Sequence, residues 1–301
     1  MKKLSVILLF AILVSATSYS QVGVKLSSLP PDEISNYIKP AATWFGTYFN
    51  SGTYYDADVD DTFGFKFNIV GMWTLIPDDQ KTFQPNPQLE GVETPDPTAT
   101  VFGNKSSYFL SKNGFFTYPA GFALNAIPSG IVQVSGSFFN TELMLRLFPK
   151  SKFENTEVGL FGFGIKHDIS SHIPLLPIDI SVQILYNNFS IEYSGDIEDY
   201  TNVQSSNFAF NVHASKTFAS VFIVYGGLQY ESTSMDFEYY FEDPNDLYPN
   251  IADQNHKQKI DGENNFRLTL GSALKLGFFV MNADVNLTKL TTFTFGLSFD
   301  F

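Results

Sequence analysis

The last nine residues of the chain alternate between apolar and polar side chains. The apolar set is Phe293, Phe295, Leu297, Phe299 and Phe301, and the polar set is Thr294, Gly296, Ser298 and Asp300. Because successive side chains of a β-strand point to opposite faces, this alternation predicts a strand with one apolar and one polar face. Strands of a transmembrane barrel have this pattern, with the apolar face toward lipid and the polar face toward the lumen.

The same period of two recurs in at least seven further segments. These segments span residues 63–74, 142–147, 161–166, 178–194, 207–215, 266–275 and 279–286. A soluble sandwich must bury each apolar face in one core, whereas lipid can cover any number of them. The pattern therefore predicts an all-β fold, a transmembrane antiparallel β-barrel.

One segment changes parity along its length. Up to Asn187 the apolar set is Ile178, Ile180, Val182, Ile184 and Tyr186, and after it the set is Phe189, Ile191 and Tyr193. One inserted residue moves every later side chain to the other face of a strand, so we expect a β-bulge near Asn187.

Turn residues divide the chain into eleven candidate strands. They are 41–54, 62–75, 131–138, 140–149, 156–168, 177–194, 204–217, 218–240, 263–276, 277–287 and 290–301. Bacterial single-chain barrels have an even strand number, so a further strand is expected, at Thr98–Leu110. We predict about twelve strands, with ten and fourteen as alternatives.

Loop lengths predict the orientation of the barrel. Short links near residues 139, 217 and 277 are typical of periplasmic turns, and the longer stretches 150–155, 195–203 and 241–262 are typical of outer loops. The acidic turn 56–61 is also expected to be an outer loop. Segment 77–130 is rich in proline, which removes ladder donors, so it either folds into the lumen or forms an outer lid.

A short helix is predicted at residues 31–39, before the first strand. Pro31 suits the first turn, Asp32 and Glu33 complement the positive helix end, and Pro40 is expected to stop the helix. The segment 21–40 is either a loose periplasmic tail or a plug inside the barrel. For a plug, we expect a lumen pocket with ligand contacts from Ile34, Tyr37, Phe115, Phe116 and Phe122.

Composition excludes several classes of protein. The 301 residues contain no cysteine, which rules out a disulfide scaffold and a cysteine-ligated metal site. Lys and Arg number 18 against 31 Asp and Glu, a net charge of −13, so a basic nucleic-acid footprint is absent. The 44% apolar content argues against disorder.

The first twenty residues have the features of a signal peptide. Lys2 and Lys3 precede an apolar run from Leu4 to Val14, and small residues follow as far as Ser20. We expect cleavage between Ser20 and Gln21. The alternative, a transmembrane anchor, would need about 20 apolar residues. The expected parts are thus a signal peptide at 1–20, a tail or plug at 21–40 and a barrel at 41–301.

Nine charged side chains are expected to point into the lumen. They are Lys66, Glu142, Arg146, Lys166, Asp168, Glu192, Arg267, Lys275 and Asp284. Opposite charges on neighbouring strands can pair and fill a narrow barrel, or they can form a selectivity constriction. Glu142 and Arg146 lie on a strand next to that of Lys166 and Asp168.

No pattern of residues indicates an enzyme, a metal site or a cofactor. His213 falls on a lumen face, where a hydrogen-bonded histidine is a simpler interpretation than a catalytic one. Asp56, Asp58, Asp60 and Asp61 lack the spacing of a calcium loop, which favours solvated charge. Trp44, Tyr48, Trp73 and Tyr230 are candidates for interfacial aromatic belts.

The C-terminal segment resembles the signal read by the outer-membrane barrel assembly machinery. Thr294, Gly296, Phe299 and Phe301 occupy its four positions. Residues 141–149, 161–168, 173–183 and 266–271 resemble a family of uncharacterised outer-membrane barrels, itself similar to the long-chain fatty-acid and aromatic-hydrocarbon transporters. That wider resemblance implies fourteen strands, an N-terminal hatch and a lateral opening.

Two functions are therefore expected for a protein of the Gram-negative outer membrane. The first is a passive channel or transporter for a small hydrophobic ligand. The alternative is a structural or surface-interaction barrel without transport, with 77–130 and 241–262 as docking loops. Outer-membrane lipid and the assembly machinery are the expected partners, and no nucleic acid is expected.

Overall fold

The computed structural model describes residues 26–301, apart from residues 88, 90, 91, 113, 174, 175, 196–199, 244 and 245. The predicted signal peptide at 1–20, its cleavage after Ser20 and the start of the 21–40 segment lie outside the described residues. No helix among the described residues is long and apolar enough to cross a membrane.

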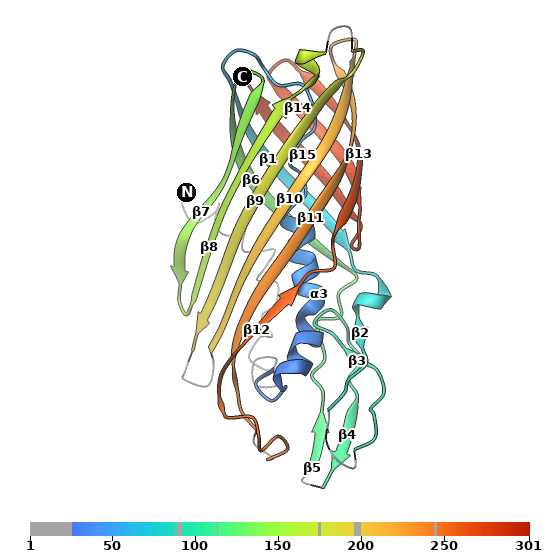
Figure 1. Ribbon diagram of the computed structural model, residues 1–301, viewed down its shortest axis with the longest axis vertical. Helices are drawn as coiled ribbons and strands as arrows, with labels where there is room; N and C mark the ends of the chain where they lie inside the picture. Colours follow the sequence, from blue (N-terminus) through green and yellow to red (C-terminus); the bar gives the residue numbers. More distant parts are fainter. Residues whose placement is uncertain are drawn as a thin grey trace.

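Ten antiparallel strands form a closed barrel (Figure 1). In chain order they are β1 (Gly64–Leu75), β6 (Ala126–Phe138), β7 (Thr141–Phe153), β8 (Thr156–Asp168), β9 (Asp179–Ser194), β10 (Tyr200–Phe218), β11 (Phe222–Phe241), β13 (Phe266–Leu276), β14 (Phe279–Leu287) and β15 (Thr292–Asp300). Strand β12 (Gln254–Asp261) pairs with β11 alone, beyond the end of β13. The all-β barrel is confirmed, and the ten strands that close it match the lower of the two alternatives to the predicted count of about twelve.

Two of the predicted strands do not belong to the barrel. Residues 41–54 fall mostly in helix α3 (Pro31–Phe49), which runs through Pro40 instead of stopping there. Within Thr98–Leu110 only two short strands occur, β3 (Thr98–Ala99) and the start of β4 (Tyr108–Ser111), and neither joins the barrel sheet.

The loops separate into two groups at opposite ends of the barrel. The turns at 139–140, 219–221 and 277–278 lie at the end where the chain terminates, and the β7–β8, β9–β10 and β11–β12 connections lie at the other end (Figure 1). The predicted assignment of these connections to two ends is matched, but the predicted outer loop 150–155 is wrong: β7 and β8 continue through it and leave only Glu154 and Asn155 as a turn.

The wall is apolar outside and polar inside. Exposed residues alternate with buried polar ones along each strand, as Ile69 and Trp73 do with Asn68 and Thr74 on β1. Such inversion of the usual burial pattern is what a barrel in lipid requires.

The predicted bulge at Asn187 is wrong. β9 pairs without interruption with β8 and with β10 along its length. Its outward set simply changes from Ile184 and Tyr186 to Asn188 and Ser190, while the inward set changes from Gln183 to Phe189. Along β9 the outer face changes from apolar to polar and the inner face from polar to apolar. The apolar residues therefore change sides although the strand itself is regular. The register shift that does occur lies in β7, between Phe148 and Ser151.

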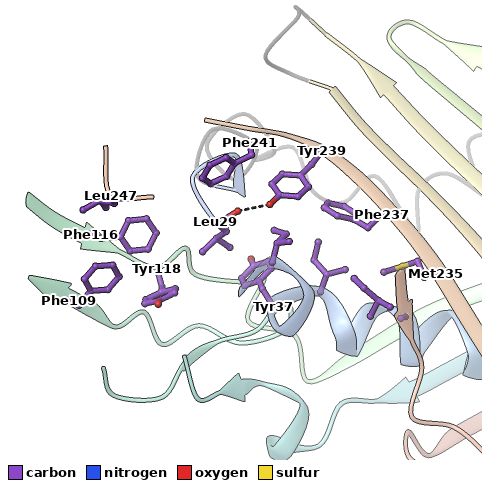
Figure 2. Packing of buried hydrophobic residues seen from close by; sticks show 14 residues of the cluster. Leu29, Tyr37, Phe109, Phe116, Tyr118, Met235, Phe237, Tyr239, Phe241 and Leu247 are labelled. Carbon is purple, nitrogen blue, oxygen red and sulfur yellow. Dashed lines mark hydrogen bonds between the residues drawn. The ribbon is translucent and has the colours of Figure 1, made fainter. Parts of the chain in front are cut away.

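Strand β11 shows the same exchange of polarity. Its outward residues Leu228 and Tyr230 are followed by Ser232 and Ser234, and its inward residues become Met235 and Phe237. Beyond this point the strand forms part of a cap, together with the start of α3, segment 76–125 and β12. The cap core contains Leu29, Tyr37, Phe109, Phe116, Tyr118, Phe237, Tyr239, Phe241 and Leu247 (Figure 2).

Residues 77–125 of the predicted segment 77–130 therefore contribute to a cap at the end opposite the C-terminus, whereas residues 126–130 begin the barrel strand β6. The cap part includes a 3₁₀ turn at Asp78–Gln80, β2 (Thr82–Phe83), β3, β4 and β5 (Gly114–Thr117). The predicted outer lid describes this arrangement better than the alternative of a segment folded into the lumen.

Candidate functional site: the plug and the seam in the wall

Helix α3 and the segment after it fill the lumen. The helix enters from the cap, and residues 50–61 continue to the opposite end, where Asp61 O accepts a hydrogen bond from Phe139 N at 3.1 Å. We call residues 41–61 the plug. The predicted plug at 21–40 is misplaced, because its described part, residues 26–40, packs in the cap. The acidic turn 56–61, predicted as an outer loop, is thus wrongly placed: it lies at the end that carries the C-terminus.

Wall side chains bind the carbonyl end of α3. The last turn of the helix has no basic residue of its own. Arg146 Nη1 donates to Phe49 O at 2.6 Å, Asn187 Nδ2 donates to the same oxygen at 3.1 Å, and Arg267 Nη2 donates to Thr47 O at 3.1 Å. Because the last carbonyls of a helix lack partners and carry partial negative charge, two buried guanidinium groups stabilise this end.

The extended part of the plug is held in the same way. Gln229 Nε2 donates to Asn50 O at 3.2 Å, Gln133 Nε2 donates to Gly52 O at 3.2 Å, and Ser181 Oγ donates to Ala57 O at 2.5 Å. These contacts reach the main chain of the plug, and each comes from a polar residue on the inner face of the wall.

The charged residues of the lumen form two buried groups. Glu142 Oε2 lies 3.0 Å from Lys66 Nζ and 3.1 Å from Lys166 Nζ, on three different strands. Arg267 Nη2 lies 3.0 Å from Glu231 Oε2, a partner that the sequence analysis did not include. Predicted cross-strand pairing is therefore confirmed for the Glu142 group, whereas Arg146 binds carbonyl and amide oxygens of the plug and of Gln133 instead of a carboxylate.

The remaining predicted lumen charges are dispersed. Lys275 pairs with Asp300 at 3.2 Å, Asp284 accepts a hydrogen bond from Tyr225 at 2.8 Å, and Asp168 accepts one from Ser170 N at 2.8 Å. Glu192 is wrongly predicted as inward: it follows Asn188 and Ser190 on the outer face of β9. The parity change at the level of Asn187, interpreted as a bulge, caused this error.

Two cavities lie along residues 52–61 of the plug. The cavity beside Lys66, Glu142 and Tyr55 holds about 10 Å³, which is room for about one water molecule. A larger hollow of about 410 Å³ opens at the C-terminal end, lined by Asp58, Asp60, Asp61, Asp168 and Asp179. No group of three or more His, Asp or Glu suited to a metal ion occurs in the described part of the chain.

The five predicted ligand contacts do not line one pocket. Ile34, Tyr37 and Phe116 pack together in the cap core. Phe115 is exposed on the outer face of the β4–β5 hairpin, and Phe122 is partly exposed in the segment before β6. Contact of these residues with a ligand stays a prediction.

Other predicted residues lie as follows. His213 is buried in the lumen, stacks on Tyr54 at 3.9 Å between ring centroids and shares a hydrogen bond with Asn211. Trp73 and Tyr230 are exposed on the outer wall, but Trp44 and Tyr48 belong to α3 inside the barrel and so are wrongly predicted as belt residues.

In the C-terminal strand, Thr294 is buried and Phe301 is exposed. A Cβ atom on Gly296 would lie 2.0 Å from Asn282 Oδ1, so this position favours glycine. Phe299 packs across the sheet against Phe67, with ring centroids 6.4 Å apart. Recognition of Thr294, Gly296, Phe299 and Phe301 by an assembly machinery stays a prediction.

The wall is interrupted between β6 and β7. These strands share only five residue pairs, from Phe138↔Thr141 to Val134↔Leu145. Residues 126–133 of β6 and 146–153 of β7 are unpaired with each other, and we call this interruption the seam. Pro128 and Pro149 lie on its two edges, which suits unpaired strands because proline has no N–H to donate.

Aromatic residues of the plug lie behind the seam. Tyr48 Oη donates to Gly130 O on the open edge of β6 at 2.7 Å. Phe45 packs against Phe189 at 5.3 Å between ring centroids, and the partly buried Phe148 and Leu160 join this cluster. The other edge of β6 pairs with β1 at this level, where Ile69 and Trp73 are exposed on the outer wall. The seam therefore opens within the apolar part of the wall.

Together these features define a closed, ten-stranded antiparallel β-barrel with an apolar outer wall, a polar inner wall and a helical plug. The chain belongs to a family of unknown function, DUF6588, whose model matches residues 1–301. No curated protein matches the chain.

Several solved barrels overlap the chain at low similarity. Outer membrane protease OmpT from Escherichia coli has 9% identity and a TM-score of 0.33, with 80% of this chain and 97% of that chain covered. Ail, the attachment invasion locus protein of Yersinia pestis, has 9% identity and a TM-score of 0.22, with 79% and 99% covered. A mutant porin of Rh. blastica has 9% identity and a TM-score of 0.17, with 79% and 99% covered. At these scores the overlaps carry no argument about activity, and these three do not support the expected similarity to fatty-acid transporters.

Proposed function

We propose that the protein is an outer-membrane barrel that moves a small hydrophobic ligand between the bilayer and the cell exterior by way of the seam. The observation that carries this proposal is the five-pair contact between β6 and β7, with aromatic side chains of the plug behind the unpaired edges. The apolar outer wall supports the membrane placement, as does the resemblance of residues 294–301 to an assembly signal.

The chemistry of the seam favours an apolar ligand. Backbone groups at membrane depth need partners, and Tyr48 supplies one for Gly130. The side chains that cluster behind it include Phe45, Phe148, Leu160 and Phe189. The charged residues of its β7 edge are Arg146, which is bound to the plug and to Gln133, and the exposed Lys150 and Lys152. The filled lumen argues against a water-filled pore, so the ligand would reach the plug from the side.

Photolabelling tests this route. The protein is placed in nanodiscs containing 3-(trifluoromethyl)-3-phenyldiazirine, irradiated, and digested for mass spectrometry. The proposal predicts label on Phe45 and Tyr48 of α3 as well as on the outer wall. Absence of label on α3, with the outer wall labelled, would count against it.

A cysteine pair supplies the matched control, because the natural chain has no cysteine. In Val132→Cys/Leu147→Cys, a short bismaleimide would bridge the open seam and remove label from α3. In Val134→Cys/Leu145→Cys, whose residues already pair, the same bridge would leave α3 labelled. Equal labelling of α3 in both bridged variants would show that the seam is not the route.

The second candidate is a structural or surface-interaction barrel without transport. The plug supports it, since wall side chains hold its main chain from Thr47 to Ala57 and the cavity beside it has room for about one water. An α3 that remains unlabelled, together with ion conductance near zero in planar bilayers, would favour this function.

A further inference from the structure

The β4–β5 hairpin exposes large apolar side chains on one face. Tyr108, Leu110 and Phe115 are each more than half exposed, at 60%, 67% and 55%. Leu110 pairs across the hairpin with Phe115, and the rings of Tyr108 and Phe115 lie 5.1 Å apart. Three adjacent apolar residues on a short hairpin form a surface that the fold itself does not cover.

The opposite face of the same hairpin is fixed in the cap core. Phe109 and Phe116 are buried, with stacked rings 5.1 Å apart, and Tyr118 N donates to Ser107 O at 3.0 Å. Leu247, from the acidic 242–253 loop, packs on this buried side. The hairpin is therefore anchored through Phe109 and Phe116, which Figure 2 shows beside Tyr118 and Leu247.

The segment that carries the hairpin is basic, whereas the 242–253 loop packed on its buried side is acidic, with Glu242, Asp243, Asp246 and Asp253. The chain has 31 acidic residues, yet none lies between Asp96 and Glu142. The hairpin region instead has two lysines, Lys105 and Lys112, and both are exposed. Aromatic and leucine side chains beside lysines are the combination that binds the interface of an anionic membrane.

The hairpin lies too far along the molecule to contact the bilayer that surrounds the barrel. Figure 1 places β4 and β5 at the far end of the cap, at the end of the long axis opposite the C-terminus. A lipid surface that contacts the hairpin must belong to a second membrane or vesicle.

We infer that the β4–β5 hairpin is a docking site for a second lipid surface with anionic headgroups, with Tyr108, Leu110 and Phe115 entering the interface and Lys105 and Lys112 binding the headgroups. This inference rests on the proposed membrane placement but is independent of a ligand at the seam. The experiment keeps the two apart, because the barrel is already in a bilayer before vesicles are added.

The test uses the full chain in phosphatidylcholine nanodiscs, mixed with vesicles of seven parts phosphatidylcholine to three parts phosphatidylglycerol. Co-flotation at low salt is expected for the natural protein. The variant Tyr108→Ser/Leu110→Ser/Phe115→Ser should bind at least about tenfold more weakly, because the exposed apolar contacts are lost. The variant Lys105→Gln/Lys112→Gln should lose about fivefold per lysine.

The control variant is Lys150→Gln/Lys152→Gln, which removes two lysines near the same end of the barrel and should bind like the natural protein. Circular dichroism confirms that each variant is folded. Failure of the natural protein to float with anionic vesicles, or equal flotation of the serine variant, would overturn the inference.

A second measurement detects insertion directly. Phe115→Trp should be quenched by vesicles that contain brominated phosphatidylglycerol, whereas the native Trp44 and Trp73 in the barrel should not respond. If tryptophan fluorescence is quenched no more in the Phe115→Trp variant than in the natural protein, the inference is also overturned.

Discussion

Arg146 connects the wall to the plug through two main-chain oxygen atoms and binds a third oxygen on the neighbouring wall strand. Its guanidinium group is 0% exposed and donates to Phe49 O, Ser51 O and Gln133 Oε1. A buried charge of this kind is stabilising only when its hydrogen bonds are complete, which makes Arg146 and the plug dependent on each other.

We expect Arg146→Met to lower the free energy of unfolding by about 3 kcal/mol, because two plug carbonyls lose a charged donor. Urea unfolding monitored by circular dichroism measures this change, and hydrogen exchange should rise in residues 47–57. Lys152→Met on the same strand serves as the control. A loss below about 0.5 kcal/mol would show that the carbonyls find other donors.

Gly46 lies where α3 packs tightly against the wall. A Cβ atom at this position would lie 2.2 Å from Thr233 Oγ1. Gly46→Val should therefore displace the plug and raise ion conductance in planar bilayers above the near-zero value expected for the natural protein. Conductance that does not change would mean that the wall yields to the added side chain.

Strand parity in the sequence was sufficient to place Lys66, Glu142 and Lys166 in the lumen, and Glu142 and Lys166 on adjacent strands. It did not identify Lys66 as the second partner of Glu142. It could not supply the partners of Arg146, because residues 41–54 are aromatic and β-branched enough to resemble a strand. Inside the barrel this segment packs against both apolar and polar wall residues. This packing overrides the local preference for a strand, and the helix continues even through Pro40.

At the scale of elements, the parity change on β9 and β11 marks where the wall leaves lipid. Tyr186 and Asn188 on β9, and Tyr230 and Ser232 on β11, are successive outward residues of opposite polarity. A single sequence shows only that apolar residues changed faces, which a bulge also explains. The uninterrupted register resolves the ambiguity in favour of a change of surroundings.

The cap has a titratable group in its interior. Glu33 is 2% exposed and accepts a hydrogen bond from Asn86 N at 2.6 Å. Burial raises the pKa of the Glu33 carboxyl above its ordinary value, opposed by the Asn86 hydrogen bond and assisted by Asp32.

A raised pKa in the folded state means that the cap binds a proton more tightly than the unfolded chain does. The contribution of Glu33 to stability is therefore complete below its ordinary pKa and decreases as pH rises through the raised value. We expect hydrogen exchange in the cap, corrected for intrinsic rates, to increase from pH 4.5 to pH 8, and Glu33→Gln to reduce this increase. An identical pH profile in the variant would remove Glu33 as the cause.

For the whole molecule, the apolar outer wall sets the position of the bilayer. On β1 it extends from Phe63 to Trp73, both exposed. Ten residues at about 3.3 Å each, on a strand tilted by about 40°, give a band of about 25 Å, the height typical of an outer-membrane barrel. The fold class was evident from this alternation, whereas strand number was not, because the plug and cap contain segments that imitate strands.

The central claim, that lipid covers the wall up to a boundary between Tyr230 and Ser232, is tested most directly by spin labels at every outward position of β11. The protein is reconstituted into bilayers, and accessibility to oxygen is compared with accessibility to a water-soluble nickel complex. The account predicts oxygen-dominated relaxation at Phe222, Val224, Leu228 and Tyr230 and nickel-dominated relaxation from Ser232 to Tyr240. Nickel accessibility along the whole strand, in a protein that stays monomeric in water without detergent, would contradict it.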